Sequence, residues 1–255
     1  MGALWDGLIQ GLSGFLRFLH DGTAGLFGLY AWGWAIILLT FAVRLVLLPL
    51  AVKQTNSMRA MQKLQPEMKK IQAKYRADRS MMRTHPEKYR ARKQKQQEAM
   101  MALYKEHNVN PAASCLPLLL QMPIFFALYR VLIEQPELRT APFYLIPNLA
   151  SSPGQGLAVA GVGAFILIIL MAITTFYSQY QMQARTPVAG EQQAQQQKIL
   201  LYAMPLMLTV IAFQLPAGVL LYWVATNLWT MGQQYVMFRD IEPATVPAAQ
   251  QSGKG

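Results

Sequence analysis

Apolar and polar residues follow one another in long blocks along this chain of 255 residues. About 20 apolar residues in a helix are enough to cross the hydrocarbon core of a membrane. The fourth apolar block is short and contains Pro205, and only Gln214 and Leu215 separate it from the fifth, so these two blocks predict a tight helical hairpin. The pattern as a whole predicts an all-α polytopic membrane protein with five transmembrane helices, at residues 30–52, 111–135, 157–182, 199–214 and 216–238.

Residues 1–29 precede the first of these segments. Apolar residues recur near helical spacing from Leu4 to Leu19, and no basic region comes before them as it would in a cleavable signal. This pattern predicts an N-terminal amphipathic, interfacial helix that lies on the outer face of the membrane. A glycine-rich hinge ending at Gly28 is expected to follow it.

One long polar block, residues 53–110, interrupts the apolar pattern. Residues 53–107 hold 15 of the 23 lysines and arginines and 5 of the 12 acidic residues, a net charge of +10. Because short loops rich in basic residues stay in the cytoplasm, we expect this block inside, with the N-terminus outside and the C-terminus inside. The same topology makes residues 136–156 an outer loop, residues 183–198 a cytoplasmic loop and residues 239–255 a disordered cytoplasmic tail.

The polar block has its own helical pattern. Apolar residues recur in steps of three and four from Met58 to Tyr75, and Pro86 suits the first position of a second helix, so we expect a cytoplasmic helical hairpin. Its basic residues are either a solvated face that sets topology or a surface for anionic lipids or ribosomal RNA. Its methionines either fill the core between the two arms or form an adaptable surface for apolar ligands. The methionines expected to contact such ligands are Met58, Met61, Met68, Met81 and Met82.

Arg44 is the one charged residue in the first apolar block. A guanidinium at that depth costs roughly 2.5 kcal/mol or more, and it does not escape the cost by losing its proton. The side chain could reach toward the membrane surface or pair with an acid, but the nearest candidates, Glu134 and Glu137, stand at a segment end. Intramembrane charge usually faces a polar cavity, so Arg44 is the expected centre of the functional site.

Polar residues on the other apolar segments fall on helical faces that could converge on Arg44. Thr40 precedes Arg44 by one turn, Gln121 ends a stripe in the second segment, and Gln179 lies in a stripe at the end of the third. The fifth segment carries Trp223, Thr226, Asn227, Thr230 and Gln234 on one face. Together they predict a hydrated, cationic concavity, whereas ordinary hydrogen bonds between helices are the alternative for any one residue.

Catalytic chemistry finds no support in the sequence. There is no nucleophile–base motif, no glycine-rich phosphate loop and no zinc motif, so we expect neither an enzyme nor a cofactor nor a small-molecule substrate. The single cysteine, Cys115, has no metal-ligand neighbours. A coupled ion transporter would need an intramembrane acid or visible repeats, and the sequence shows neither.

Four stretches of the chain carry specific motifs: LQPEMKKIQAKY at residues 64–75, MALYKEHNVNPAASCLPLLLQMPIFFALYRVL at residues 101–132, LPAGVLLYWVATNLWTMGQQYV at residues 215–236, and FAVRLVLLPL around Arg44. Together these stretches resemble the YidC/Oxa/Alb family of membrane protein insertases. The resemblance covers residues 30–238. It departs from the family pattern at Ser114, where glycine is usual, and in the longer hairpin around residues 78–88.

The resemblance implies a multi-pass protein of the bacterial plasma (inner) membrane that inserts hydrophobic nascent membrane proteins into the bilayer. A groove open to the cytoplasm and to lipid would hold the hydrophilic part of a client, with Arg44 as its cation and Gln121, Trp223 and Asn227 as its lining; Gln179 aligns more loosely. The implied partners are the ribosome, the Sec translocon, a targeting factor and anionic lipids. A non-catalytic pore or a lipid scramblase is the alternative function, and it would need a path open on both sides.

Overall fold

The computed structural model describes residues 2–75, 80–110, 116–185 and 191–239. Within these ranges the chain is helical and forms no β-strand, only an isolated bridge between Phe143 and Ile146. The prediction of an all-α protein is therefore confirmed for the described residues.

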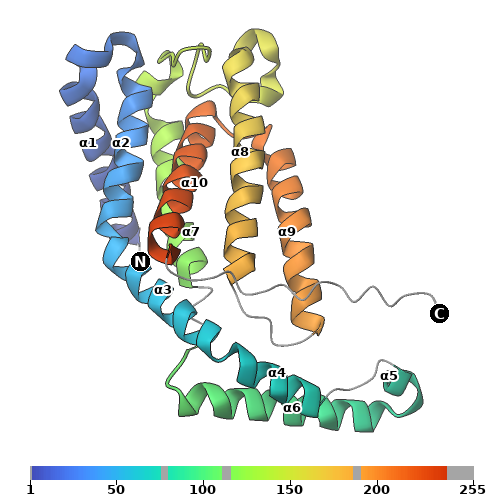
Figure 1. The fold of residues 1–255 in the computed structure, drawn as a ribbon. Coiled ribbons are helices and arrows are strands. Elements are labelled where there is room, and N and C mark those ends of the chain that lie inside the picture. The colour runs from blue at the N-terminus through green and yellow to red at the C-terminus, as the bar shows by residue number, and fades with distance from the viewer. Residues whose placement is uncertain (1, 76–79, 111–115, 186–190, 240–255) are drawn as a thin grey trace.

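The long helices stand side by side in a bundle (Figure 1). The helix α10 contacts α2, α7 and α8, while α9 packs on α8, and α1 packs on α2 and α7. The bundle consists of α1 (Gly2–Phe27), α2 (Ala31–Val46), α7 (Leu116–Glu134), α8 (Leu157–Arg185), α9 (Glu191–Ala212) and α10 (Ala217–Phe238). Three short 3₁₀ turns accompany these helices in the described chain: η1 (Gly28–Tyr30), η3 (Pro136–Arg139) and η4 (Pro153–Gln155).

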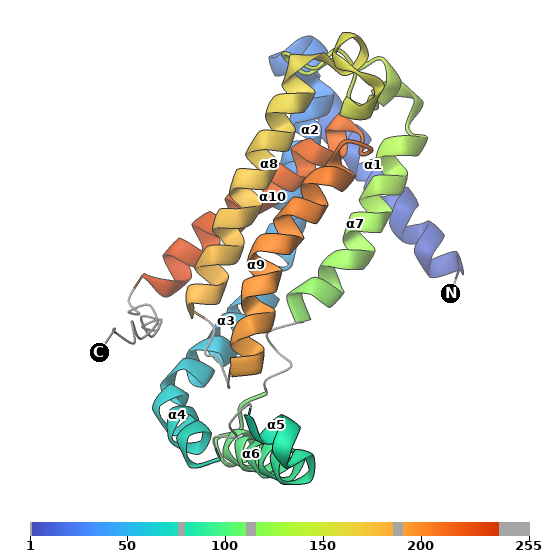
Figure 2. The ribbon, with the colours of Figure 1, turned by 90° about the vertical axis from the view of Figure 1, so that its right-hand side faces the viewer.

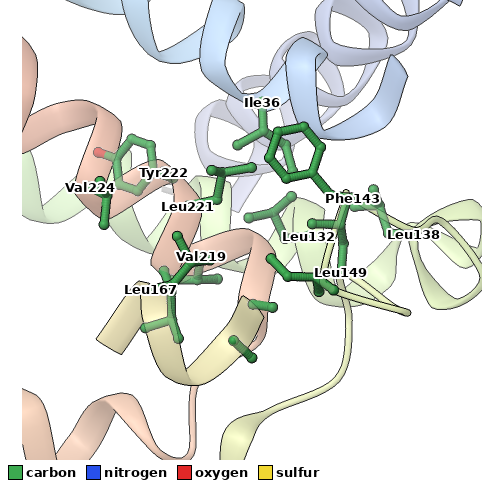
Figure 3. Close-up of a cluster of buried hydrophobic side chains, with 14 of the residues drawn as sticks. Ile36, Leu132, Leu138, Phe143, Leu149, Leu167, Val219, Leu221, Tyr222 and Val224 are labelled. Carbon is green, nitrogen blue, oxygen red and sulfur yellow. The ribbon is translucent and has the colours of Figure 1, made fainter. Parts of the chain in front are cut away.

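A buried apolar core holds the bundle together at the end that carries residues 136–156. Figure 3 shows Ile36 of α2 and Leu132 of α7 among side chains of the loop and of α10. Phe143 from the loop lies so close to α2 that a Cβ added to Gly33 would come within 2.0 Å of its ring. Only a residue without a side chain allows this approach, so Gly33 fixes how the loop closes over the core.

The N-terminal helix α1 differs from its prediction. It is 26 residues long and runs lengthwise along α2 and α7, where we expected a shorter helix lying flat on the membrane face (Figure 1). Leu16 is fully buried, and Arg17 forms an ion pair with Glu137 at 3.2 Å. An amphipathic pattern shows that one face is apolar but not whether lipid or protein covers it. Of the expected hinge, only Gly28 leaves the helix, with a φ of +52°.

The first apolar segment forms a bent helix where the sequence predicted one span. α2 ends at Val46 and α3 (Leu48–Lys63) begins two residues later, with Pro49 in its first turn. Proline has no N–H to donate to the carbonyl one turn earlier, and its ring pushes that carbonyl aside. The neighbouring amides stay bonded, Leu47 N to Val43 O and Ala51 N to Leu47 O, both at 3.0 Å. The chain therefore bends at Leu47 without unfolding.

Beyond α3 the chain forms an arm, which we define as α4 (Gln65–Lys74), α5 (Ser80–Thr84) and α6 (Pro86–Glu106). The arm lies past the end of the bundle opposite residues 136–156 (Figure 2). α4 and α5 both pack against α6. Between α4 and α6, Met68, Met100, Leu103 and Tyr104 form a small core of their own. Burial raises the pKa of the Tyr104 phenol.

Contacts with the C-terminal end of α10 attach α3 to the bundle. The Arg59 guanidinium donates to the carbonyl oxygen of Met237 and lies 5.9 Å from the centroid of the Phe238 ring. The Thr55 hydroxyl is 3.2 Å from the Met237 sulfur. A cation bound to the last carbonyls of a helix satisfies a group that has no partner within the helix and also interacts well with its dipole.

Large apolar side chains cover much of the outer surface of the bundle. Ile169 and Ile173 on α8 and Leu206 and Val210 on α9 are each about 60–70% exposed. By length and hydropathy alone, two helical stretches of the described chain, Gly2–Val46 and Leu157–Ala184, could cross a membrane. An aqueous surface rarely carries so wide an apolar band, whereas lipid covers one without cost.

Candidate functional site

Arg44 lies in the last turn of α2, just before the bend at Leu47. Its side chain is partly buried and, among the described residues, forms neither a hydrogen bond nor an ion pair. The two acids considered as its partners are engaged elsewhere, since Glu134 pairs with Arg130 and Glu137 with Arg17. The ion-pair alternative therefore has no support in the described residues.

Tyr222 of α10 brings a second helix to this place. Its phenol is buried, and its polar end lies near the Arg44 guanidinium. Gln121 of α7 donates a hydrogen bond from Nε2 to the Tyr222 oxygen. Helices α2, α7 and α10 thus each contribute a polar group here, and the combination of a cation, a phenol and an amide can bind a carboxylate, a peptide group or water.

Tyr222 is not among the site residues predicted from the sequence. The residue precedes Thr226 by one helical turn, so it belongs to the same face as part of the predicted stripe. An aromatic residue in an apolar segment is usually packed in the core, so the sequence gives no direct sign of a polar role for the Tyr222 hydroxyl. The signal that could have revealed it is the requirement that a buried phenol find a hydrogen-bond partner.

The other predicted residues of α2 and α10 lie in different environments. Thr40 is buried, and its hydroxyl donates to the Ile36 carbonyl of the same helix at 2.7 Å. Trp223 is partly buried, with its ring edge-to-face against Phe125 of α7 at 5.4 Å between centroids. Thr226 is buried one turn after Tyr222. These side chains pack between helices around the position of Arg44 and Tyr222.

Asn227 and Gln179 link neighbouring helices. The Asn227 amide is buried and donates to the hydroxyls of Thr174 and Thr175 of α8, at 3.1 and 2.8 Å. The Gln179 amide lies 3.7 Å from the sulfur of Met204 on α9. For these two residues the geometry favours the alternative interpretation, hydrogen bonding between helices. Ser114, at the start of the predicted stripe of the second segment, lies outside the described residues.

The methionines of the polar block are mostly buried. Met58, Met61 and Met68 are each no more than 5% exposed, and Met81 is partly buried. The side chain of Met82 lies outside the described residues. Burial favours core filling over an open surface for apolar ligands at the first three positions.

Two cavities of the structure lie away from Arg44. One, of about 380 Å³, is lined by residues of the loop such as Arg139 and Asn148, and the other, of about 400 Å³, lies between α1 and the end of α7. None of the predicted site residues lines either of them. Across the described ranges, histidine, cysteine and acidic side chains form no group of three or more that could hold a metal ion.

Comparison with known proteins identifies the class to which this fold belongs. A family model described as 60Kd inner membrane protein matches residues 23–244, so the chain belongs to that family. Proteins named membrane protein insertase YidC are similar to it over most of its length, and the resemblance predicted from the sequence is confirmed.

Three of these relatives show the extent of the match. The protein from Streptomyces avermitilis is 39% identical over 236 residues, which cover 83% of this chain and 52% of that one. The protein from Syntrophobacter fumaroxidans is 36% identical over 232 residues, covering 89% and 36%, and that from Campylobacter jejuni is 38% identical over 224 residues, covering 88% and 36%. The chain thus spans between about a third and a half of the length of these curated relatives.

Proposed function

We propose that this chain is a membrane protein insertase and chaperone, which receives hydrophobic segments of client proteins from the cytoplasm and passes them into the bilayer. The observation that carries the proposal is Arg44, a permanent cation within an apolar bundle that has no counter-ion among the described residues. Its place beside Tyr222 and Gln121, in a chain of this family, supports the proposal that Arg44 is the centre of a hydrophilic groove.

The proposed topology follows from charge and surface. Five spans, α2 with the first turns of α3, then α7, α8, α9 and α10, place the start of α2 outside and the C-terminus inside the bacterial inner membrane, while α1 packs along α2 and α7. The arm carries most of the net positive charge, so it lies in the cytoplasm. Residues 136–156 then face the outside, where they close the bundle. The apolar side chains exposed on α8 and α9 contact lipid.

In this mechanism, Arg44 attracts the polar part of a client. Two unit charges about 4 Å apart, at an effective dielectric constant of about 20, attract each other by about 4 kcal/mol. That is enough to favour entry of an acidic segment, yet weak enough to release it. Tyr222 and Gln121 offer hydrogen bonds to the client backbone or to water, and Trp223 and Thr226 line the passage.

The apolar part of the client leaves sideways. Met122, Phe126 and Ile133 share one exposed face of α7, and α9 presents Leu206 and Val210. A client helix that slides along these faces exchanges contacts with lipid for contacts with protein of equal polarity, so its release costs little. Insertion then needs no covalent chemistry and no cofactor.

The arm is proposed to act earlier, at recruitment. Its exposed basic residues can contact anionic lipids, the ribosome, the Sec translocon or a targeting factor before the client reaches Arg44. Because Met58, Met61 and Met68 are buried, capture of apolar segments by these methionines would require α3 and α4 to separate from their neighbours.

The test is insertion of a single-span client with an acidic N-terminal tail into proteoliposomes that contain the purified chain. Arg44→Lys keeps the charge and is expected to retain much of the activity, whereas Arg44→Ala is expected to retain little. Arg139→Ala, which removes an exposed arginine, is the matched control. Equal activity of all variants would exclude Arg44 from the mechanism. Ion or lipid flux without client insertion would show a pore or a scramblase instead.

A further inference from the structure

The cavity between α1 and the end of α7 has no role in the proposed insertion pathway. Its volume of about 400 Å³ falls within the range of about 300–1,000 Å³ that is usual for small-molecule sites. Gln10, Ser13 and Arg17 line it from α1, and Glu134 and Gln135 line it from the end of α7. Polar and charged groups therefore meet in a hollow of a bundle whose outer surface is apolar.

Gln135 is the buried polar group of this cavity. It is 4% exposed, and its Oε1 accepts a hydrogen bond from the Ser13 hydroxyl at 2.9 Å. Its Nε2 is buried without a hydrogen-bond partner among the described residues. Amide donors that lose water without gaining an acceptor are rare in folded proteins, so an acceptor supplied from outside the chain would complete the site.

Two opposite charges stand at the rim of the cavity. Arg17 binds Glu137 at 3.2 Å, and Glu134 binds Arg130, so each has one partner outside the cavity. A guanidinium carries five N–H donors and a carboxylate carries two acceptor oxygens, so both groups keep capacity for a further ligand. The cavity thus offers a cation and donors on the α1 side and an anion on the α7 side.

We propose that this cavity binds the headgroup of phosphatidylethanolamine. The phosphate would lie against Arg17 and the Gln135 amide, and the ammonium against Glu134, which matches both charges of the headgroup. Phe15 and Phe18 of α1 and Phe126 and Ile133 of α7 are exposed, so acyl chains attached to the headgroup would meet apolar surfaces. The bound lipid would hold α1 against α7. This inference depends on the membrane location of the bundle and not on client insertion.

The test measures which lipids stay bound to the full chain. Purified protein is equilibrated with equal amounts of phosphatidylethanolamine, phosphatidylcholine and phosphatidylglycerol, and the retained lipids are counted by native mass spectrometry. Wild-type protein is expected to retain phosphatidylethanolamine preferentially. Arg17→Gln should lower the affinity of the protein for phosphatidylethanolamine roughly tenfold, because one charge-assisted hydrogen bond is lost. Glu134→Gln should remove the preference over phosphatidylcholine, whose ammonium has no N–H donor.

Matched variants separate binding from folding. Arg17→Lys keeps the cation and is expected to retain the lipid, and Arg139→Gln, on the wall of the other cavity, should change nothing. Equal retention of the three lipids by the wild type, or equal loss in Arg17→Lys and Arg17→Gln, would overturn the proposal. Displacement of the lipid by millimolar inorganic phosphate would also overturn it, because the site would then be one for free phosphate.

Discussion

Asn227 offers a direct way to separate a packing role from a groove role. In the structure its amide makes two hydrogen bonds across the α8–α10 interface, to Thr174 and Thr175. Asn227→Leu keeps the branched shape of the side chain but removes both hydrogen bonds. Because hydrogen bonds between membrane helices average about 0.6 kcal/mol each and reach about 1.7, the expected loss of stability is about 1–3 kcal/mol. Most of that loss should disappear in a background where both threonines are valine.

The assay is thermal unfolding of the purified protein in detergent, followed by client insertion at a temperature where each variant is folded. A loss of 1 kcal/mol lowers Tm by roughly 2–4 °C in domains of this size, so Asn227→Leu should unfold several degrees earlier. Gln179→Leu is the control, since the one hydrogen bond of its amide to the described residues is a weak one to the Met204 sulfur at 3.7 Å. An unchanged Tm together with lost insertion would refute the packing argument and return Asn227 to the groove.

Two further predictions concern the arm and its attachment. Met68→Ala empties a fully buried site between α4 and α6 and should cost about 2–5 kcal/mol of local stability, seen as faster proteolysis of the arm, whereas the exposed Met101→Ala should have little effect. Arg59→Met removes the hydrogen bond to the Met237 carbonyl and the contact with Phe238, so hydrogen exchange at the end of α10 should accelerate. Lys63→Met, at an exposed position of α3, is the control and should leave exchange in α10 unchanged. If exchange at the end of α10 is as slow in Arg59→Met as in this control, Arg59 does not stabilise α10.

The sequence predicts the apolar parts of the helices because the apolar blocks are long, but it places residues 191–198 in a loop, and these residues belong to α9. The sequence does not predict which helices pack against one another. The periodicity of α1 shows an apolar face, but the burial of Leu16 against the bundle depends on helices that are far away in the chain. The bend at Leu47 could have been inferred from Pro49, since proline leaves a carbonyl without its donor. The continuous apolar character of residues 30–52 instead led to the prediction of one unbroken span.

For the candidate site too, the local pattern predicts the helical face but not the contacts between helices. Spacing of three and four residues predicts that Thr226 and Asn227 belong to one polar face of a helix, but it does not say which helix lies opposite. Asn227 faces α8, whereas Tyr222, not selected from the sequence, faces Gln121 and Arg44. The direction of a polar side chain follows from the packing of several helices, which local periodicity does not contain.

The bend at Leu47 lies three residues beyond Arg44, and α3 could pivot there as a rigid helix. The 16 residues of α3 span about 24 Å at about 1.5 Å per residue, so a rotation of about 10° at the bend sweeps the far end through about 4 Å. Arg44 would barely move. The hydrogen bond from Arg59 to the Met237 carbonyl lies partway along α3, so a force on the arm would act first on the end of α10. A force applied to the arm would therefore reach α10, the helix that carries Tyr222, through the bond between Arg59 and Met237.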